Sequence, residues 1–274
     1  MSIVLAAVDG SAVSRDCLRA AVVLAELLAA APEALHVSDQ PSPQLQRLAA
    51  ATGVRLTSRR GEPAAELVAA LCAPEVVMGV LGSSGTGDTK VPQGRTAAAV
   101  MSASNTPLLI VPPGSFPPAL RRLHRVLVPL DGRAASAAAV VPVLRMLSDA
   151  GLELVVVHVF DRATVPSFWD QPQHATAAWE REFLHRNLPF HTARLRLRHG
   201  TPAAMVMQAG SEEQTDLVVM GWSRDLSPGR ALTLEHQLAH GRLPLLLVPV
   251  APDAVIDLTA PATATAQSPA QGGQ

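Results

Sequence analysis

The sequence predicts an α/β protein built as two tandem doubly wound domains, each with a five-stranded parallel sheet of order 3-2-1-4-5 flanked by helices. Short β-branched runs alternate with Ala- and Leu-rich stretches of helical length, which is typical of this class. A chain of 274 residues suits two domains. Four segments occur twice in the same order and indicate a duplication: Ala7–Gly10 with Pro129–Gly132, Leu35–Val37 with Val157–Val159, Val76–Gly79 with Val218–Gly221, and Leu109–Pro112 with Leu246–Pro249.

The strands follow from the short apolar runs. We expect them at 3–8, 34–38, 54–59, 75–79 and 107–111 in the first repeat, and at 125–130, 152–159, 192–198, 216–221 and 244–248 in the second. Continuous runs such as Leu154–Val157 predict strands that are buried on both faces, as in parallel sheets.

Three helices carry clear signals. Residues 13–30 have a broad apolar surface, and we expect Ser11 to cap this helix. A second helix opens at Glu62-Pro63, with the proline in its first turn. A third is expected at roughly 95–104, after a glycine-rich loop.

Composition marks domain boundaries. We expect the first domain at 1–114, a Pro-containing linker at 115–124 and the second domain at 125–252. From 253 to 274 the chain consists mainly of Ala, Thr, Pro, Gln and Gly without apolar periodicity, which predicts a disordered tail.

Spacing between equivalent residues shows where the repeats differ. The offset is 122 for Asp9 and Asp131 and for His36 and His158, 139 for Gly61 and Gly200, 142 for Gly79 and Gly221, and 137 for Pro107 and Pro244. These offsets predict a long insertion in the second repeat, within about 161–190, and a longer glycine-rich loop in the first.

Charge and composition exclude several classes. A net charge of -1 argues against an electrostatic nucleic-acid binder, and no apolar run approaches the ~20 residues of a membrane span. The N-terminus lacks the charged region of a signal peptide. Cys17 and Cys72 lie in apolar helical segments, so we expect reduced core cysteines and a cytoplasmic protein.

The segment from Gly79 to Thr96 has the chemistry of a phosphate site. Its glycines allow close backbone approach, its Ser and Thr residues add hydroxyl donors, and Lys90 and Arg95 add positive charge. A helix N-terminus follows and favours anions. At the switch point of a doubly wound sheet, Asp9 and this loop face one crevice. The alternative is a solvent loop, with Asp9 serving only as a helix cap, which is also our interpretation of Asp131.

Two common phosphate motifs fit this loop poorly. Gly82 and Gly87 have Walker spacing, but Asp88 stands where lysine is required. Gly85 and Gly87 lack the third glycine of a dinucleotide fingerprint.

The chain resembles the universal stress proteins as two tandem copies. The resemblance rests on Val8–Ser11, His36-Val37, Gly61–Pro63, Val76–Gly79 with its glycine-rich loop, and Pro107–Val111. It implies the nucleotide motif Gly-x2-Gly-x9-Gly-Ser/Thr. Gly79 and Gly82 match its start, Gly94 follows after eleven residues, and Arg95 replaces Ser/Thr. In the second repeat, Arg224 replaces the second glycine, so we expect no ATP there.

The resemblance and the loop chemistry together imply a site for ATP or another adenine nucleotide, with Mg²⁺ as a companion ion. Asp9 would meet the ribose or the metal. The expected site comprises Ala7, Val8, Asp9, Val37, Met78, Gly79, Gly82, Ser83, Ser84, Lys90, Gly94, Arg95 and Thr96.

Histidines and aromatic residues suggest no catalytic centre. We interpret His36 and His158 as satisfied core residues, and His236 and His240 as one polar helix face. No Ser/His/Asp, CxxC or HExxH pattern is present. Trp179 and Phe183 share a helix face in the insertion, which either packs on its own sheet or forms a lid or partner surface.

Three functions remain as hypotheses. The first is a non-catalytic stress-response protein in which the first repeat senses an adenine nucleotide that orders the glycine-rich loop for a protein partner. The second is a nucleotide-free interaction module. The third is a weak ATPase, for which no catalytic constellation can be named. We expect the repeats to form an intramolecular pseudo-dimer through their last strands, with a homodimer as a further option and no nucleic-acid or membrane partner.

Overall fold

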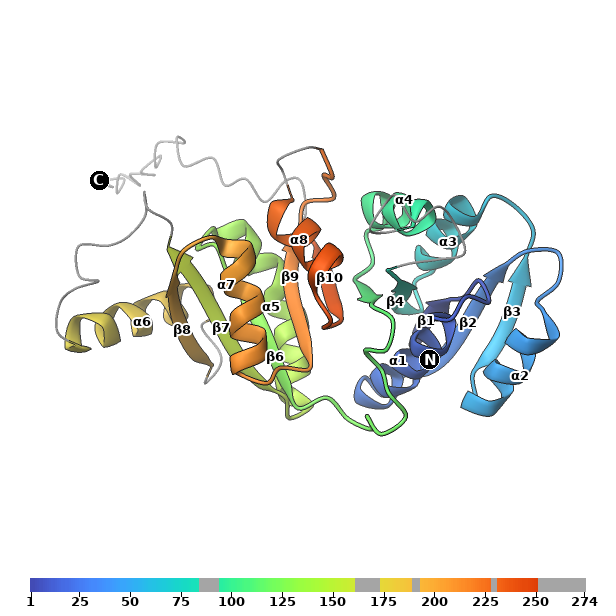
Figure 1. The fold of residues 1–274 in the computed structure, drawn as a ribbon, viewed down its shortest axis with the longest axis horizontal. Helices are drawn as coiled ribbons and strands as arrows, with labels where there is room; N and C mark the ends of the chain where they lie inside the picture. Colours follow the sequence, from blue (N-terminus) through green and yellow to red (C-terminus); the bar gives the residue numbers. More distant parts are fainter. Residues whose placement is uncertain (84–93, 161–172, 189–192, 228–230, 251–274) are drawn as a thin grey trace, which may run out of the picture.

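The computed structural model describes residues 1–83, 94–160, 173–188, 193–227 and 231–250. Ten strands in this part of the chain form one sheet of order β3-β2-β1-β4-β5-β10-β9-β6-β7-β8 (Figure 1). Each predicted strand is confirmed to within three residues. The strands are β1 (Ile3–Ala7), β2 (Ala31–Val37), β3 (Arg55–Arg59), β4 (Val76–Gly82), β5 (Leu108–Val111), β6 (Arg125–Pro129), β7 (Glu153–Phe160), β8 (Arg194–His199), β9 (Leu217–Trp222) and β10 (Leu245–Pro249).

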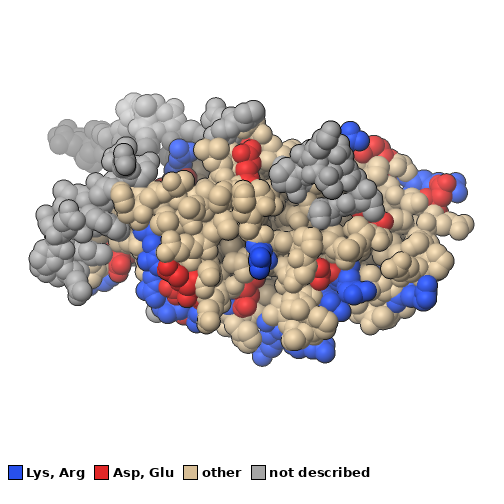
Figure 2. All heavy atoms as spheres, viewed as in Figure 1, with Lys and Arg blue, Asp and Glu red and all other residues tan. Residues whose placement is uncertain are grey.

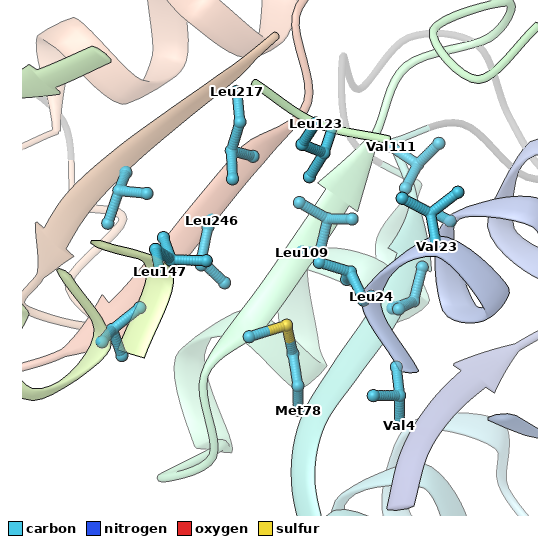
Figure 3. Packing of buried hydrophobic residues seen from close by; sticks show 14 of the residues in the cluster. Val4, Val23, Leu24, Met78, Leu109, Val111, Leu123, Leu147, Leu217 and Leu246 are labelled. Atoms are coloured by element: carbon cyan, nitrogen blue, oxygen red, sulfur yellow. The ribbon is translucent and has the colours of Figure 1, made fainter. Parts of the chain in front are cut away.

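One antiparallel pair joins two parallel halves. Each half has the predicted order 3-2-1-4-5, and β5 pairs antiparallel with β10, so that Leu109 lies opposite Leu246 (Figure 3). The predicted pairing through the last strands is therefore confirmed. Because the strands of the two halves run in opposite directions, the carboxyl ends of one half lie beside the amino ends of the other.

Helices cover both faces of the sheet. One face carries α1 (Ser14–Leu27), α2 (Pro43–Thr52), α5 (Ala134–Asp149) and α6 (Gln173–Asn187), and the other carries α3 (Pro63–Leu71), α4 (Arg95–Ala103), α7 (Pro202–Glu212) and α8 (Leu232–His240). The buried hydrophobic residues form one cluster under each set. Each cluster crosses the central strand pair, since one contains Leu109 and Leu246 and the other contains Ile110 and Leu245.

Helix starts agree with the sequence in two of three cases. At α3, the Glu62 side chain accepts a hydrogen bond from the Ala65 amide and Pro63 is the first residue, as predicted. Helix α4 begins at Arg95, also as predicted. Ser11 as the cap of α1 is wrong: the N-cap is Val13, and the Ser11 amide instead donates to the Asp9 carboxylate.

The two cysteines lie in different surroundings. Cys17 is buried in α1, as expected, and burial raises the pKa of its thiol far above the usual range. Cys72 is exposed, so its prediction as a core residue is wrong. Cys72 is the C-cap of α3, one residue beyond the buried Leu71 that ends the helix.

Strand register corrects the alignment of the repeats. Leu5 pairs with Gly79 in the first half, and its equivalent Leu127 pairs with Val218 in the second. The strands on the other side of β4 and β9 give the same alignment. Leu108 of β5 pairs with Gly79, and its equivalent Leu245 of β10 pairs with Val218.

Gly79 therefore corresponds to Val218, at an offset of 139, and the match of Gly79 with Gly221 is wrong by three residues. The Val-Val-Met-Gly sequence lies earlier in β4, which has a register irregularity beside Ile3 and Val4 and continues to Gly82. Gly82 is thus the equivalent of Gly221. The loop of the first repeat is longer by only two residues.

The segment between the halves is packed against the first half. Phe116 and Leu123 are buried in the cluster beneath α1. The Asp16 carboxylate accepts a hydrogen bond from the Gly114 amide at 2.7 Å, and Arg19 donates to the Phe116 carbonyl. Figure 1 shows this segment passing along one side from β5 to β6. The tail expected at 253–274 and residues 161–172 of the insertion lie outside the described residues.

A turn after the first helix of each repeat gives a matched pair for stability measurements. Ala29 has φ 50° and its equivalent Gly151 has φ 87°. Left-handed backbone strains alanine but not glycine, and a Cβ on Gly151 would meet no atom of the described residues within 4 Å. We expect Ala29→Gly to raise the free energy of unfolding by about 0.5 kcal/mol and Gly151→Ala to lower it by about 1 kcal/mol in urea titrations. Effects of the same sign for both changes would contradict this account.

Ion pairs at the outer strand β8 predict a pH effect. Arg194 and Arg196 lie 3.6 and 2.5 Å from the Glu213 carboxylate, and Figure 2 shows acidic and basic groups side by side at this end. The hydrogen bond from Arg196 holds the pKa of Glu213 below its usual range. Wild type should therefore exceed Glu213→Gln in unfolding free energy above pH about 4.5, and the difference should vanish as the pH falls through the native pKa. Urea titrations between pH 3 and 7 test this, and a difference that grows on acidification would contradict it.

Candidate functional site

A cavity of about 410 Å³ lies at the carboxyl ends of β1, β2 and β4. Strand β1 pairs with β2 on one side and β4 on the other, so this is the switch point where doubly wound sheets bind ligands. Its volume is within the range of small-molecule sites. The lining residues are Ala7, Val8, Asp9, Val13, Ser14, Leu35, His36, Val37, Pro63, Leu67, Leu81, Gly82, Gly94, Arg95, Thr96 and Ala97.

The turn after β1 fixes a carboxylate at the cavity wall. The buried Ser14 hydroxyl accepts hydrogen bonds from the Asp9 and Gly10 amides and donates to Asp9 Oδ1, at 3.1–3.2 Å. The Ser11 amide donates to the same oxygen at 2.9 Å. Gly10 has φ 82°, which only glycine adopts without strain.

The helix-cap interpretation is wrong for both aspartates. Neither α1 nor α5 has a side-chain cap, and the N-cap of α5 is Arg133. Asp131 accepts from the Arg133 amide at 2.9 Å, which is the turn that Asp9 makes with Ser11. The carboxylates therefore stabilise the turn that precedes the helix.

His36 forms a second part of the wall. Its Nδ1 lies 2.7 Å from the Val8 carbonyl oxygen. Because a carbonyl can only accept, Nδ1 carries the proton. The prediction of a satisfied histidine holds for this nitrogen, but His36 is only half-buried and belongs to the cavity lining.

The N-terminus of α4 forms the opposite wall. Its N-cap is Gly94, which has no side chain to offer, and the first helical hydrogen bond runs from the Ala98 amide to the Gly94 carbonyl. The amides of Arg95, Thr96 and Ala97 therefore have no acceptor within the helix. The Gly94 amide donates to the Ser83 carbonyl at 3.1 Å, which brings the start of α4 to the end of β4.

Eight of the thirteen predicted site residues lie together in this cavity: Ala7, Val8, Asp9, Val37, Gly82, Gly94, Arg95 and Thr96. Met78 is instead fully buried in the core. A Cβ on Gly79 would lie 2.6 Å from a Leu71 methyl carbon, so Gly79 packs beneath α3. Ser83 is buried and does not line the cavity. Ser84 and Lys90 lie outside the described residues.

Sequence reasoning missed eight lining residues: Val13, Ser14, Leu35, His36, Pro63, Leu67, Leu81 and Ala97. A usable signal existed for two of them. In a parallel sheet, each helix begins at the edge where the preceding strand ends, so the first residues of α1 and α3, Ser14 and Pro63, face the same edge as Asp9.

In the second repeat, aromatic rings occupy the corresponding region. His158 Nδ1 lies 2.7 Å from the Leu130 carbonyl oxygen, as in the first repeat. The centroids of Phe160, Trp179 and Phe183 lie 4.6, 5.5 and 4.8 Å from that of His158. Trp179 and Phe183 also stack on each other at 4.9 Å, within the cluster beneath α5. The interpretation of this helix as packed on its own sheet is therefore confirmed for the described residues.

The strand end of the second repeat contacts the first repeat. Trp222, the equivalent of Ser83, is buried, and its indole N–H donates to the Met101 carbonyl of α4 at 2.9 Å. Leu232 stands at the position of Arg95. At these two positions the second repeat thus has apolar groups where the first has polar ones.

Other site types find little support in the described part of the chain. His236 and His240 lie with ring centroids 4.6 Å apart, but no group of three His, Cys, Asp or Glu residues there could hold a metal ion. Among the same residues, no helix is both long and apolar enough to cross a membrane.

Two doubly wound domains, joined through their last strands and with a switch-point cavity in the first, define a tandem α/β protein. Residues 122–249, which make up the second half of the fold, match the Universal stress protein family. No curated protein matches the sequence.

Solved structures share the complete fold. A universal stress protein from Archaeoglobus fulgidus is similar with a TM-score of 0.65 and 15% identity, covering 91% of this chain and 98% of its own. A functionally unknown protein from Pseudomonas aeruginosa has a TM-score of 0.64 and 11% identity, covering 91% of this chain and 93% of its own. These likenesses show that the arrangement of two such halves in one chain occurs in other solved structures.

The corrected register changes how the family motif fits. Gly82 ends β4 and corresponds to Gly221, so Gly82 rather than Gly79 is the residue at the strand end. Starting from Gly82, the sequence reads Gly82-x2-Gly85-x8-Gly94, which is one residue short of the motif rather than two residues long. Arg95 still replaces the Ser or Thr.

The aromatic cluster predicts a large stability effect. Phe183 is buried against His158 and Trp179, so Phe183→Ala should lower the free energy of unfolding by about 3 kcal/mol in urea titrations. The control is Glu182→Ala on the same helix, which removes only an exposed ion pair with Arg186 and should change stability by less than about 0.5 kcal/mol. Equal stability of the two variants would favour a lid that is not part of the core.

Proposed function

We propose that the first repeat binds an adenine nucleotide, one per chain, in a non-catalytic stress-response protein of the cytoplasm. The observation that carries this proposal is the cavity itself. It has one wall of hydrogen-bond acceptors at the end of β1 and an opposite wall of donors at the start of α4.

The donor wall suits phosphate. Arg95, Thr96 and Ala97, the first three residues of α4, line it, and a helix N-terminus attracts anions. Arg95 is exposed and lies where the helix dipole disfavours a cation. A bound anion would offset that cost. Ser84 and Lys90 are further proposed phosphate ligands from the adjoining segment.

The other walls suit a nucleoside. Leu35, Val37, Leu67 and Leu81 provide apolar surface for a base. The Asp9 carboxylate, fixed by two hydrogen bonds at Oδ1, would accept from ribose hydroxyls or hold Mg²⁺. One carboxylate is compatible with that ion, because Mg²⁺ is commonly held by one or two carboxylates together with ligand phosphates. When bound, Mg²⁺ would neutralise phosphate charge.

The response to binding would pass through the segment between Ser83 and Gly94. Gly82 and Gly94, on either side of it, line the cavity, and the Gly94 amide donates a hydrogen bond to the Ser83 carbonyl. A nucleotide that contacts Gly82 and Gly94 together would favour one state of this segment, which a protein partner could recognise. The Trp-containing second repeat would serve a structural or partner-binding role.

A nucleotide-free interaction module is the second candidate. Arg95 at the Ser/Thr position of the family motif favours it, as does the missing residue before Gly94. Under this alternative, the cavity residues would act only in a protein interface.

Calorimetric titration with ATP tests the proposal. We expect saturable binding with a stoichiometry of one. Arg95→Glu should weaken it by roughly ten- to a hundredfold, because a charged hydrogen-bond donor is replaced by a repelling carboxylate. It should not lower stability, since the helix dipole favours an acidic residue at that position. Gly82→Asp, which adds charge at the strand end, should also weaken binding.

The matched control is Leu232→Glu, which places the same carboxylate at the equivalent, exposed position of α8. It should leave ATP affinity unchanged. If wild type shows no saturable binding at millimolar ATP, the nucleotide proposal fails and the interaction module stands.

A further inference from the structure

Both repeats hold a histidine by the same bond. His36 and His158 occupy equivalent positions in β2 and β7, and each Nδ1 lies 2.7 Å from a carbonyl oxygen of the neighbouring strand end. In the neutral ring the proton is on Nδ1, so Nε2 is a hydrogen-bond acceptor. The bond fixes both the tautomer and the ring orientation.

The surroundings of the two rings differ. His158 is surrounded by Phe160, Trp179 and Phe183. In the first repeat, the equivalent of Phe160 is the exposed Ser38, and His36 is a half-buried residue of the cavity lining.

The turn glycines show the same contrast. A Cβ on Gly132 would lie 3.6 Å from the Phe183 ring, whereas one on Gly10 would have, among the described residues, only the Ser42 hydroxyl oxygen within reach, at 4.0 Å. The hydrogen bond from the histidine Nδ1 to the carbonyl of the neighbouring strand end, hereafter the tether, is therefore present in both repeats. It supports a packed aromatic group in the second repeat and a cavity wall in the first.

We infer that His36 is a ligand-binding residue whose Nε2 accepts a hydrogen bond from a neutral donor of the nucleoside, either a ribose hydroxyl or a base amine. This inference rests on the proposed nucleotide site. Asp9 adds a second acceptor on the same wall, so the part of the ligand that faces β1 and β2 must be rich in donors. The phosphates, which are acceptors, must face Arg95 and the start of α4.

Two substitutions separate the tether from the ligand contact. His36→Asn keeps an amide donor near the position of Nδ1 and removes Nε2. His36→Gln places its amide near the position of Nε2. We expect His36→Asn to weaken ATP binding by roughly three- to tenfold and His36→Gln to recover most of the affinity. His158→Asn, the matched control in the second repeat, should leave ATP affinity unchanged.

Calorimetry with ATP, 2′-deoxy-ATP, 3′-deoxy-ATP and ITP identifies the donor. The analogue that lacks the donor should bind wild type and His36→Asn equally, while the other nucleotides should retain the difference. Unchanged ATP affinity in His36→Asn would overturn the inference, as would a difference that persists for every analogue. Absence of ATP binding by wild type would instead refute the proposed nucleotide site. Thermal unfolding of each variant reports any loss of the tether separately.

Discussion

The antiparallel pairing of β5 with β10 determines the organisation of the molecule. Without this pairing, β5 and β10 would each be the edge strand of a separate half-sheet and would leave a row of unpaired amides and carbonyls. Pairing Leu108–Ile110 with Leu245–Leu247 satisfies these groups and lets both hydrophobic clusters continue across the junction. The two halves consequently share their core. Their strand ends point to opposite edges of the sheet, so the two candidate crevices are separated and are free to diverge.

The same pairing brings the crevice region of one repeat against a helix of the other. Helix α4 has its N-terminus at the cavity, and its Met101 carbonyl accepts the Trp222 indole N–H. Arg224, beside Trp222, also donates to the Asn105 side chain just beyond α4. The carboxyl end of β9, which would face a ligand in the second repeat, therefore contributes instead to the contact between the two repeats. Its large, buried indole is suited to holding two halves together and poorly suited to approaching a phosphate.

The sequence was sufficient to predict the strands but not their register. Buried parallel strands are continuous apolar runs, so the sequence predicts their positions. Such runs do not indicate which residue of one strand pairs with which residue of the next. Val-Val-Met-Gly occurs in both β4 and β9, yet hydrogen bonding places the second copy three residues further along its strand. Asp9 and Arg95 were predictable because they lie at element boundaries. Met78 and Gly79 were assigned to the site because β4 was expected to end three residues too early.

Side-chain roles within turns were equally hard to read from the sequence. Ser14 could be an ordinary first-turn serine, but in the structure its hydroxyl holds two amides and the Asp9 carboxylate at once. The histidine hydrogen bond that occurs in both repeats shows how a structural bond can leave a second polar atom for another role. One ring nitrogen is used to join neighbouring strand ends, and this structural task is identical in both repeats. The second nitrogen is not needed for it. Its environment can therefore change without loss of the fold, toward aromatic packing in one repeat and toward an acceptor at a cavity in the other.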